Sequence, residues 1–68
     1  MANSILPLAA MERLLKKGGA ERVSDNAKEA LREVLEEHAH LIAEKSVKFA
    51  LHSGRKTIKA ADIKLAAK

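Results

Sequence analysis

The side chains that could do chemistry in this sequence are bases, and they lie outside its middle segment. Residues 25–53 carry six acids and four bases, a net charge of −2. The rest of the chain carries three acids and nine bases, a net charge of +6. The nine are Arg13, Lys16, Lys17, Arg22, Arg55, Lys56, Lys59, Lys64 and Lys68. This distribution favours electrostatic binding of a polyanion by the two flanking segments.

Three of these bases share one face of a predicted helix. Arg13, Lys16 and Lys17 stand at positions i, i+3 and i+4, which are neighbours on a helix surface. The spacing fits a phosphate-binding face, and it fits the solvated face of an ordinary amphipathic helix equally well. Both interpretations stay open on the spacing alone.

The composition selects among nucleic acids. The chain has one Phe and no Trp or Tyr, so it offers no platform on which unpaired bases could stack. The exposed face of the predicted central helix is rich in Glu, whereas a major-groove reader needs Arg, Asn or Gln facing the bases. Of the modes of nucleic-acid binding considered, binding to duplex DNA through its phosphates and its minor groove is the one that fits the sequence.

Catalysis and metal binding find little support in the residues. The sequence has no cysteine. His38 and His40 are separated by one residue, which places them roughly 200° apart on a helix, too far to chelate one metal ion. No nucleophile and base pattern, metalloprotease motif or glycine-rich phosphate loop is found. We expect no enzyme, cofactor or metal, with His38 in an apolar stripe and His40 on the surface.

Proline and glycine divide the chain into three predicted helices, which makes the fold all-α. Pro7 is expected in the first turn of a short helix that stops at Gly18. Ser24 is expected to cap a long helix over residues 25 to about 53, which Gly54 ends. A last helix is predicted over residues 59–67. We expect one domain over residues 1–68.

The length of the central helix predicts a dimer. At 1.5 Å per residue it would be roughly 43 Å long, and its apolar stripe keeps the helical period throughout. Two short helices cannot cover such a stripe, so we expect a second copy of the chain to pack across it. No apolar run approaches the ~20 residues of a membrane span, so nothing directs the chain to a membrane. The absence of cysteine leaves the compartment open and fits a reducing cytoplasm, where we expect the chain.

Two motifs and the helix between them resemble the archaeal histones. Residues 19–24 read Gly-Ala-Glu-Arg-Val-Ser, and residues 54–63 read Gly-Arg-Lys-Thr-Ile-Lys-Ala-Ala-Asp-Ile. The resemblance runs in register over residues 7–67. It implies the histone fold, in which two chains clasp head to tail and the first loop of one lies beside the second loop of the other.

The resemblance also implies which residues contact DNA. Arg13, Arg22, Lys56 and Thr57 match the DNA-contacting positions of the family, and Lys16 and Lys17 lie beside them. Arg22 would enter the narrow minor groove, and Lys56 with Thr57 would hold phosphates. Thr57 could instead cap a helix or pair the loops. The implied function is bending and wrapping of DNA on the chromosome, in the nucleoid.

Other positions match structural or assembly residues of the family. Arg55 and Asp62 match an ion pair within the chain, and Phe49, His52 and Asp62 match the surface that joins dimers into tetramers or longer polymers. Gly19 matches a loop residue at which dimers stack, although it could simply terminate the first helix. The chain departs from the family at Leu51, where a basic residue is common. It also departs at its C-terminus, where relatives usually continue for a few residues beyond the position of Lys68.

Two other functions compete with DNA wrapping. A histone-fold subunit of a transcription complex would act mainly through pairing with a different chain, but it would have little reason to keep the loop bases. The chain could also pair with a paralogous histone in place of a second copy of itself. A membrane-surface protein fits poorly, because anionic lipid would repel the acidic face of the long helix.

Overall fold

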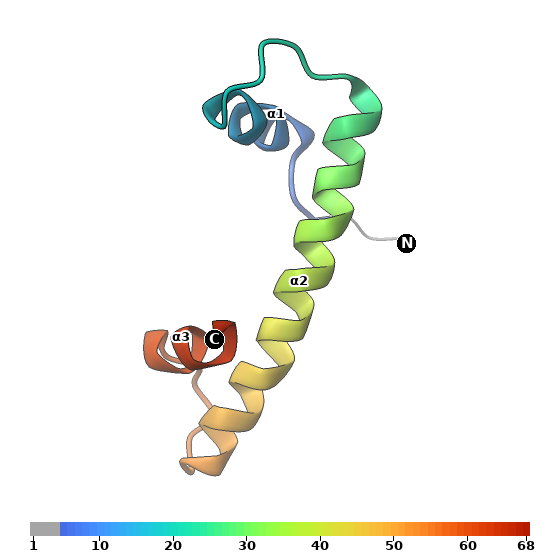
Figure 1. Cartoon of the computed structure of the whole chain (residues 1–68). Coiled ribbons are helices and arrows are strands. Elements are labelled where there is room, and N and C mark those ends of the chain that lie inside the picture. Colours follow the sequence, from blue (N-terminus) through green and yellow to red (C-terminus); the bar gives the residue numbers. More distant parts are fainter. Residues whose placement is uncertain (1–4) are drawn as a thin grey trace. The chain divides into compact units, whose positions relative to one another are not determined.

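The computed structural model describes residues 5–68, which form α-helices joined by loops (Figure 1). The helices are α1 (Leu8–Lys17), α2 (Asp25–His52) and α3 (Ala60–Ala67), and these residues contain no strand. The all-α prediction is therefore confirmed. The chain divides after Glu37 into two compact units, Met1–Glu37 and His38–Lys68, and α2 contributes to both.

Helix α1 begins and ends one residue inside the predicted limits. Pro7 has an extended backbone, with ψ of 143°, so it is the N-cap and not part of the first turn as predicted. Its carbonyl accepts a hydrogen bond from Met11 N at 3.3 Å. At the other end Gly19 N and Ala20 N donate to the carbonyls of Lys16 and Leu15, a Schellman motif that needs the positive φ of Gly19, 114°.

Helix α2 has the two boundaries that the sequence suggests. Ser24 Oγ accepts a hydrogen bond from Ala27 N at 3.1 Å, which satisfies one free amide of the first turn. After His52 the chain turns through Gly54, whose φ is 75°. Gly54 N donates to Leu51 O and Arg55 N donates to Ala50 O, both at 2.9 Å, so this end is also a Schellman motif.

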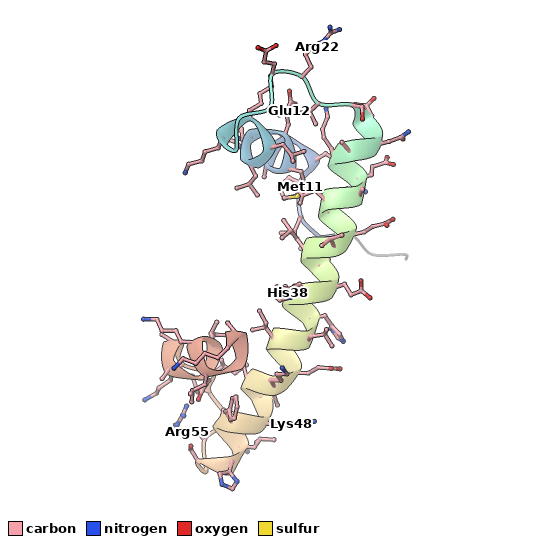
Figure 2. All side chains as sticks on the ribbon, viewed as in Figure 1. Met11, Glu12, Arg22, His38, Lys48 and Arg55 are labelled. Carbon is pink, nitrogen blue, oxygen red and sulfur yellow. The ribbon has the colours of Figure 1, made fainter. Side chains whose placement is uncertain are left out.

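The first unit packs α1 against the first half of α2 (Figure 1). Met11 is its buried centre, with 2% of its surface exposed, and Figure 2 shows its side chain directed from α1 towards α2. The backbone amides of Ile5 and Leu6 both donate to Glu36 Oε2 on α2. This carboxylate holds the segment that leads into α1.

The second unit packs α3 against the last turns of α2 through small side chains. Ala50 and Ala66 are buried, and Ser46 is completely inaccessible to solvent. Ser46 Oγ donates to Ile42 O at 2.8 Å and lies 3.5 Å from Asp62 O on α3. These small residues let the two helices approach closely.

Large apolar side chains, in contrast, lie on the surface of the single chain. Only Met11, Ala50 and Ala66 form the buried apolar core among the described residues. The exposed set comprises Ile5, Leu14, Val34, Leu41, Val47, Phe49, Leu51, Ile58, Ile63 and Leu65. His38, predicted in the apolar stripe, is also exposed. Most of the stripe predicted on α2 therefore has no cover from its own chain.

Candidate nucleic-acid interface

The first unit presents its bases on α1 and on the loop that follows. Arg13, Lys16 and Lys17 are all exposed on α1. Arg22 is exposed on the loop between α1 and α2, and Figure 2 shows it directed away from both helices of its unit. Within residues 5–68, neither Arg13, Lys17 nor Arg22 forms an ion pair. Their charges are available to an anionic ligand.

Lys16 differs from these three bases because it has a partner in the chain. Its Nζ lies 3.2 Å from Glu12 Oε2, one helical turn away. The spacing of bases on α1 predicted that Lys16 belongs with Arg13 and Lys17. The structure places the three side chains on one short helix and pairs only Lys16 with an acid.

The second unit has three of its seven bases, Arg55, Lys56 and Lys59, on a loop that Arg55 and Asp62 keep in place. Arg55 Nη1 and Nη2 donate to Asp62 Oδ2 and Oδ1, each at 3.1 Å, and Nη1 also donates to Thr57 O at 2.9 Å. Lys59 N donates to Asp62 Oδ2 at 2.8 Å. The guanidinium thus spans the loop from its first residues to α3, as the family resemblance implies for this pair.

Electrostatics reinforce this arrangement. The hydrogen bonds from Arg55, followed by that from the Lys59 amide, lower the pKa of Asp62 below its ordinary value. The hydrogen bonds to Asp62 raise the pKa of Arg55 in return. Because its pKa is lowered, the carboxylate is ionised at neutral pH, although only 4% of its side chain is exposed.

The hydrogen bonds between Arg55 and Asp62, which we call the clamp, leave Lys56 and Thr57 at the surface of the loop. Both residues are exposed, and Lys56 has no ion-pair partner in the described part of the chain. Thr57 does not cap α3, because the N-cap residue of this helix is Lys59. The backbone amide of Lys59 donates a hydrogen bond to Asp62 in the first turn. The alternative in which Thr57 caps a helix is therefore wrong.

The residues expected to join dimers lie in different environments. Phe49 and His52 are exposed near the end of α2, whereas Asp62 is buried in its own chain. Asp62 already accepts three hydrogen bonds, so about one of its four lone-pair positions is left for a partner. Gly19 has open space where a Cβ would stand, so its positive φ accounts for the glycine within this chain.

Two acids that sequence reasoning missed hold the first unit together. Glu12 binds Lys28 on α2 as well as Lys16, and Glu36 binds the backbone before α1. The spacing of Glu12 and Lys16 on one helix is visible in the sequence. The contacts of Glu12 with Lys28 and of Glu36 with Ile5 join distant segments, and no local pattern predicts them.

Neither a metal site nor a membrane span is found in the described residues. Residues 5–68 contain no group of three or more His, Cys, Asp or Glu side chains placed to hold a metal ion. Among the helices described, none is long and apolar enough to cross a membrane.

Comparison with known proteins identifies the family. Residues 4–67 match the family described as histone-like transcription factor (CBF/NF-Y) and archaeal histone. One of the subunits of the archaeal histone HAN1 from Thermococcus zilligii is 54% identical over 63 residues, which cover 93% of this chain and 94% of that protein. The probable archaeal histone 3 of Methanocaldococcus jannaschii is 52% identical over 61 residues, covering 90% and 91% of the two chains.

These matches extend over both units and both loop motifs. They confirm the predicted histone fold, since the family model covers all three helices. The family comprises archaeal histones and histone-like transcription factors, which agrees with the expectation of a protein without catalytic activity. The chain therefore belongs to the archaeal histone family and is a histone-fold, DNA-binding chromatin protein.

Proposed function

We propose that two copies of this chain pair head to tail as a single histone-fold domain over residues 1–68, and that the dimer bends and wraps duplex DNA. Binding does not depend on base sequence, and its consequence is compaction of the chromosome in the nucleoid. The observation that carries the proposal is that both loops present an exposed base without an acidic partner, Arg22 and Lys56, on a backbone fixed at defined points.

The proposed dimer accounts for the apolar surface of the single chain. Among residues 5–68, ten large apolar side chains are exposed, including Val34 at 61% and Leu41 at 53% on α2. Burying one such side chain contributes roughly 1.5–3 kcal/mol, so several of them together can offset the cost of association. A second copy provides a matching surface, since it carries the same uncovered residues.

Each proposed DNA contact has a physical role. Arg22 inserts into the minor groove, where the negative potential is strongest and no base code is needed. Lys56 and the Thr57 hydroxyl bind phosphates beside the second loop, and Arg13 and Lys17 bind phosphates from α1. Bending a site of 20–30 base pairs costs on the order of 1–6 kcal/mol, so these contacts must act together.

The experiment that tests this function measures binding to a duplex of about 100 base pairs over a series of salt concentrations. We compare the wild-type protein with Arg22→Ala and with Lys48→Ala, which removes an exposed base from α2 outside the proposed contacts. Arg22→Ala is expected to lower the affinity and to flatten the salt dependence, whereas Lys48→Ala changes both less. Nuclease protection reports whether the DNA is wrapped.

Absence of binding at low salt would contradict the proposal, as would equal effects of the two substitutions. A second function then gains weight, because the matched family also includes transcription factors and the Thermococcus relative is named as one of the subunits of a histone. In that function the chain pairs with a different histone-fold chain and acts through protein contacts. A purified chain that is monomeric alone and dimeric only with a second histone would support it.

A further inference from the structure

Glu12 lies at the centre of a small ionic network in the first unit. Its Oε2 is 3.2 Å from Lys16 Nζ on α1, and its Oε1 is 3.4 Å from Lys28 Nζ on α2. Lys28 Nζ is also 3.3 Å from Asp25 Oδ1. The network joins the two helices and contains two bases and two acids.

The four groups compensate one another electrostatically. The hydrogen bond from Lys16 and then the charge of Lys28 lower the pKa of Glu12. The hydrogen bond to Asp25 and, after it, the charge of Glu12 raise the pKa of Lys28. The network pairs two carboxylates with two ammonium groups, so its formal charges sum to zero.

A neutral cluster contributes little to polyanion binding. The part of DNA affinity that depends on salt arises from release of the counterions that the protein's bases replace on the phosphates. A phosphate that draws Lys16 away from Glu12 brings its own negative charge close to the carboxylate. The repulsion from Glu12 opposes the attraction to Lys16, and no such acid accompanies Lys17, whose side chain has no ion-pair partner in the described residues.

We propose that Glu12 excludes Lys16 from the DNA contacts of α1 while its contact with Lys28 holds α1 on α2. Glu12 is a positioning residue: it selects which bases of the Arg13, Lys16 and Lys17 face bind phosphate, leaving Arg13 and Lys17. This inference rests on the proposed function, since it concerns contacts with the same DNA. It explains why three bases on one face need not act as three equal contacts.

The test uses Lys16 and Lys17 as a matched pair. They are adjacent exposed lysines on α1, and only Lys16 pairs with an acid. Lys16→Gln and Lys17→Gln are made in the wild-type chain and in Glu12→Gln, and the slope of log affinity against log salt is measured for each on one duplex. Circular dichroism and thermal melting establish that each variant is folded.

In the wild-type chain, Lys17→Gln is expected to reduce the slope by about 1.8 for a dimer that carries two copies, and Lys16→Gln by less than half as much. In the Glu12→Gln chain the two substitutions have equal effects, because Lys16 is then free. A slope change of 1.8 corresponds to a roughly tenfold change in affinity over a fourfold range of salt.

Equal effects of Lys16→Gln and Lys17→Gln in the wild-type chain would overturn the inference and leave DNA binding itself intact. Failure of the wild-type protein to bind duplex DNA would overturn the proposed function and this inference with it. If Glu12→Gln does not fold, the comparison of the two lysine variants in the wild-type chain still decides the matter.

Discussion

Asp62 is the side chain on which the second loop depends, because it receives Arg55 and the amide of Lys59 together. Asp62→Asn keeps the size of the side chain but removes the charge that Arg55 faces. An arginine left beside a buried neutral amide loses its ion pair, so we expect the Tm to fall by at least about 5 °C. The thermal melt should be compared with that of Glu44→Gln, which removes an exposed acid whose one ion-pair partner within residues 5–68 is His40.

The same substitution predicts a loss of DNA affinity. Lys56 and Thr57 lie on the loop that Arg55 and Asp62 hold, so loosening the loop adds an ordering cost to binding. Glu44→Gln is expected to bind DNA as the wild-type chain does. If Asp62→Asn melted lower and bound with unchanged affinity, the clamp would stabilise the fold without organising the contacts.

The ion pair also gives a pH dependence whose sign is fixed. The pKa of Asp62 is lowered in the folded protein from an ordinary value of 3.8. A lowered pKa adds stability above the unfolded-state value, and this stability is lost as the pH falls through the folded-state value. The Tm difference between wild type and Asp62→Asn should therefore be constant near neutral pH and shrink below about pH 4. A difference that stayed constant down to about pH 2 would contradict the assignment.

At the scale of the helices, the sequence predicted the elements well and their first residues less well. Gly19, Gly54 and Ser24 mark the helix ends because they meet local needs, a positive φ or an acceptor for a free amide. Pro7 and Lys59 were both predicted inside helices, and both are extended N-cap residues. A proline fits either position, and the cap at Lys59 depends on Asp62, whose engagement with Arg55 is a contact seven residues apart.

The candidate site shows the same division. The exposed bases of the two loops could be predicted, because family motifs and charge distribution place them. The contact of Glu12 with Lys28 could not, since it requires knowing that α1 and the start of α2 pack together, whereas the pairing of Glu12 with Lys16 one turn away is visible in the sequence. The contact between Glu36 and the backbone of Ile5 and Leu6 is likewise a product of packing.

Ser24 provides a test of how α2 begins. Ser24→Ala removes the acceptor for Ala27 N and should cost about 1 kcal/mol, which lowers the Tm by roughly 4–8 °C for a chain of this size. Ser24→Thr keeps a hydroxyl at the same place and is expected to recover most of the loss. Equal melting of both variants and the wild type would mean that this cap does not limit stability.

Gly54 and Gly18 form a matched pair for the helix ends. Gly54 has a φ of 75°, so Gly54→Ala forces a side chain into the left-handed region at a cost of about 1–2 kcal/mol. Gly18 has a φ of −79°, which any residue adopts, and Gly18→Ala should leave the Tm within about 4 °C of the wild type. Thermal melts of the two variants distinguish a conformational requirement from a general intolerance of alanine.

At the scale of the whole molecule, the charge distribution and the exposed apolar surface both fit the proposed head-to-tail pairing with a second copy of the chain. The first unit carries seven acids and six bases, and the second carries two acids and seven bases. The proposed head-to-tail pairing would bring the basic unit of one copy to the slightly acidic unit of the other, whereas pairing of like units would place two basic units against each other. The exposed apolar residues occur in both units, so the same arrangement can cover them in both copies.

A dimer that forms as the chain folds makes thermal stability depend on protein concentration. Unfolding then also separates two chains, so a tenfold rise in concentration favours the folded state by about 1.4 kcal/mol per dimer. With an unfolding enthalpy of about 0.7 kcal/mol per residue for two chains, the Tm should rise by about 5 °C for each tenfold increase. Melting curves over a hundredfold range of concentration, with sedimentation equilibrium at both ends, measure this directly. A concentration-independent Tm together with a monomeric mass would show that the chain is stable with its apolar residues uncovered, and would remove the physical basis for the proposed dimer.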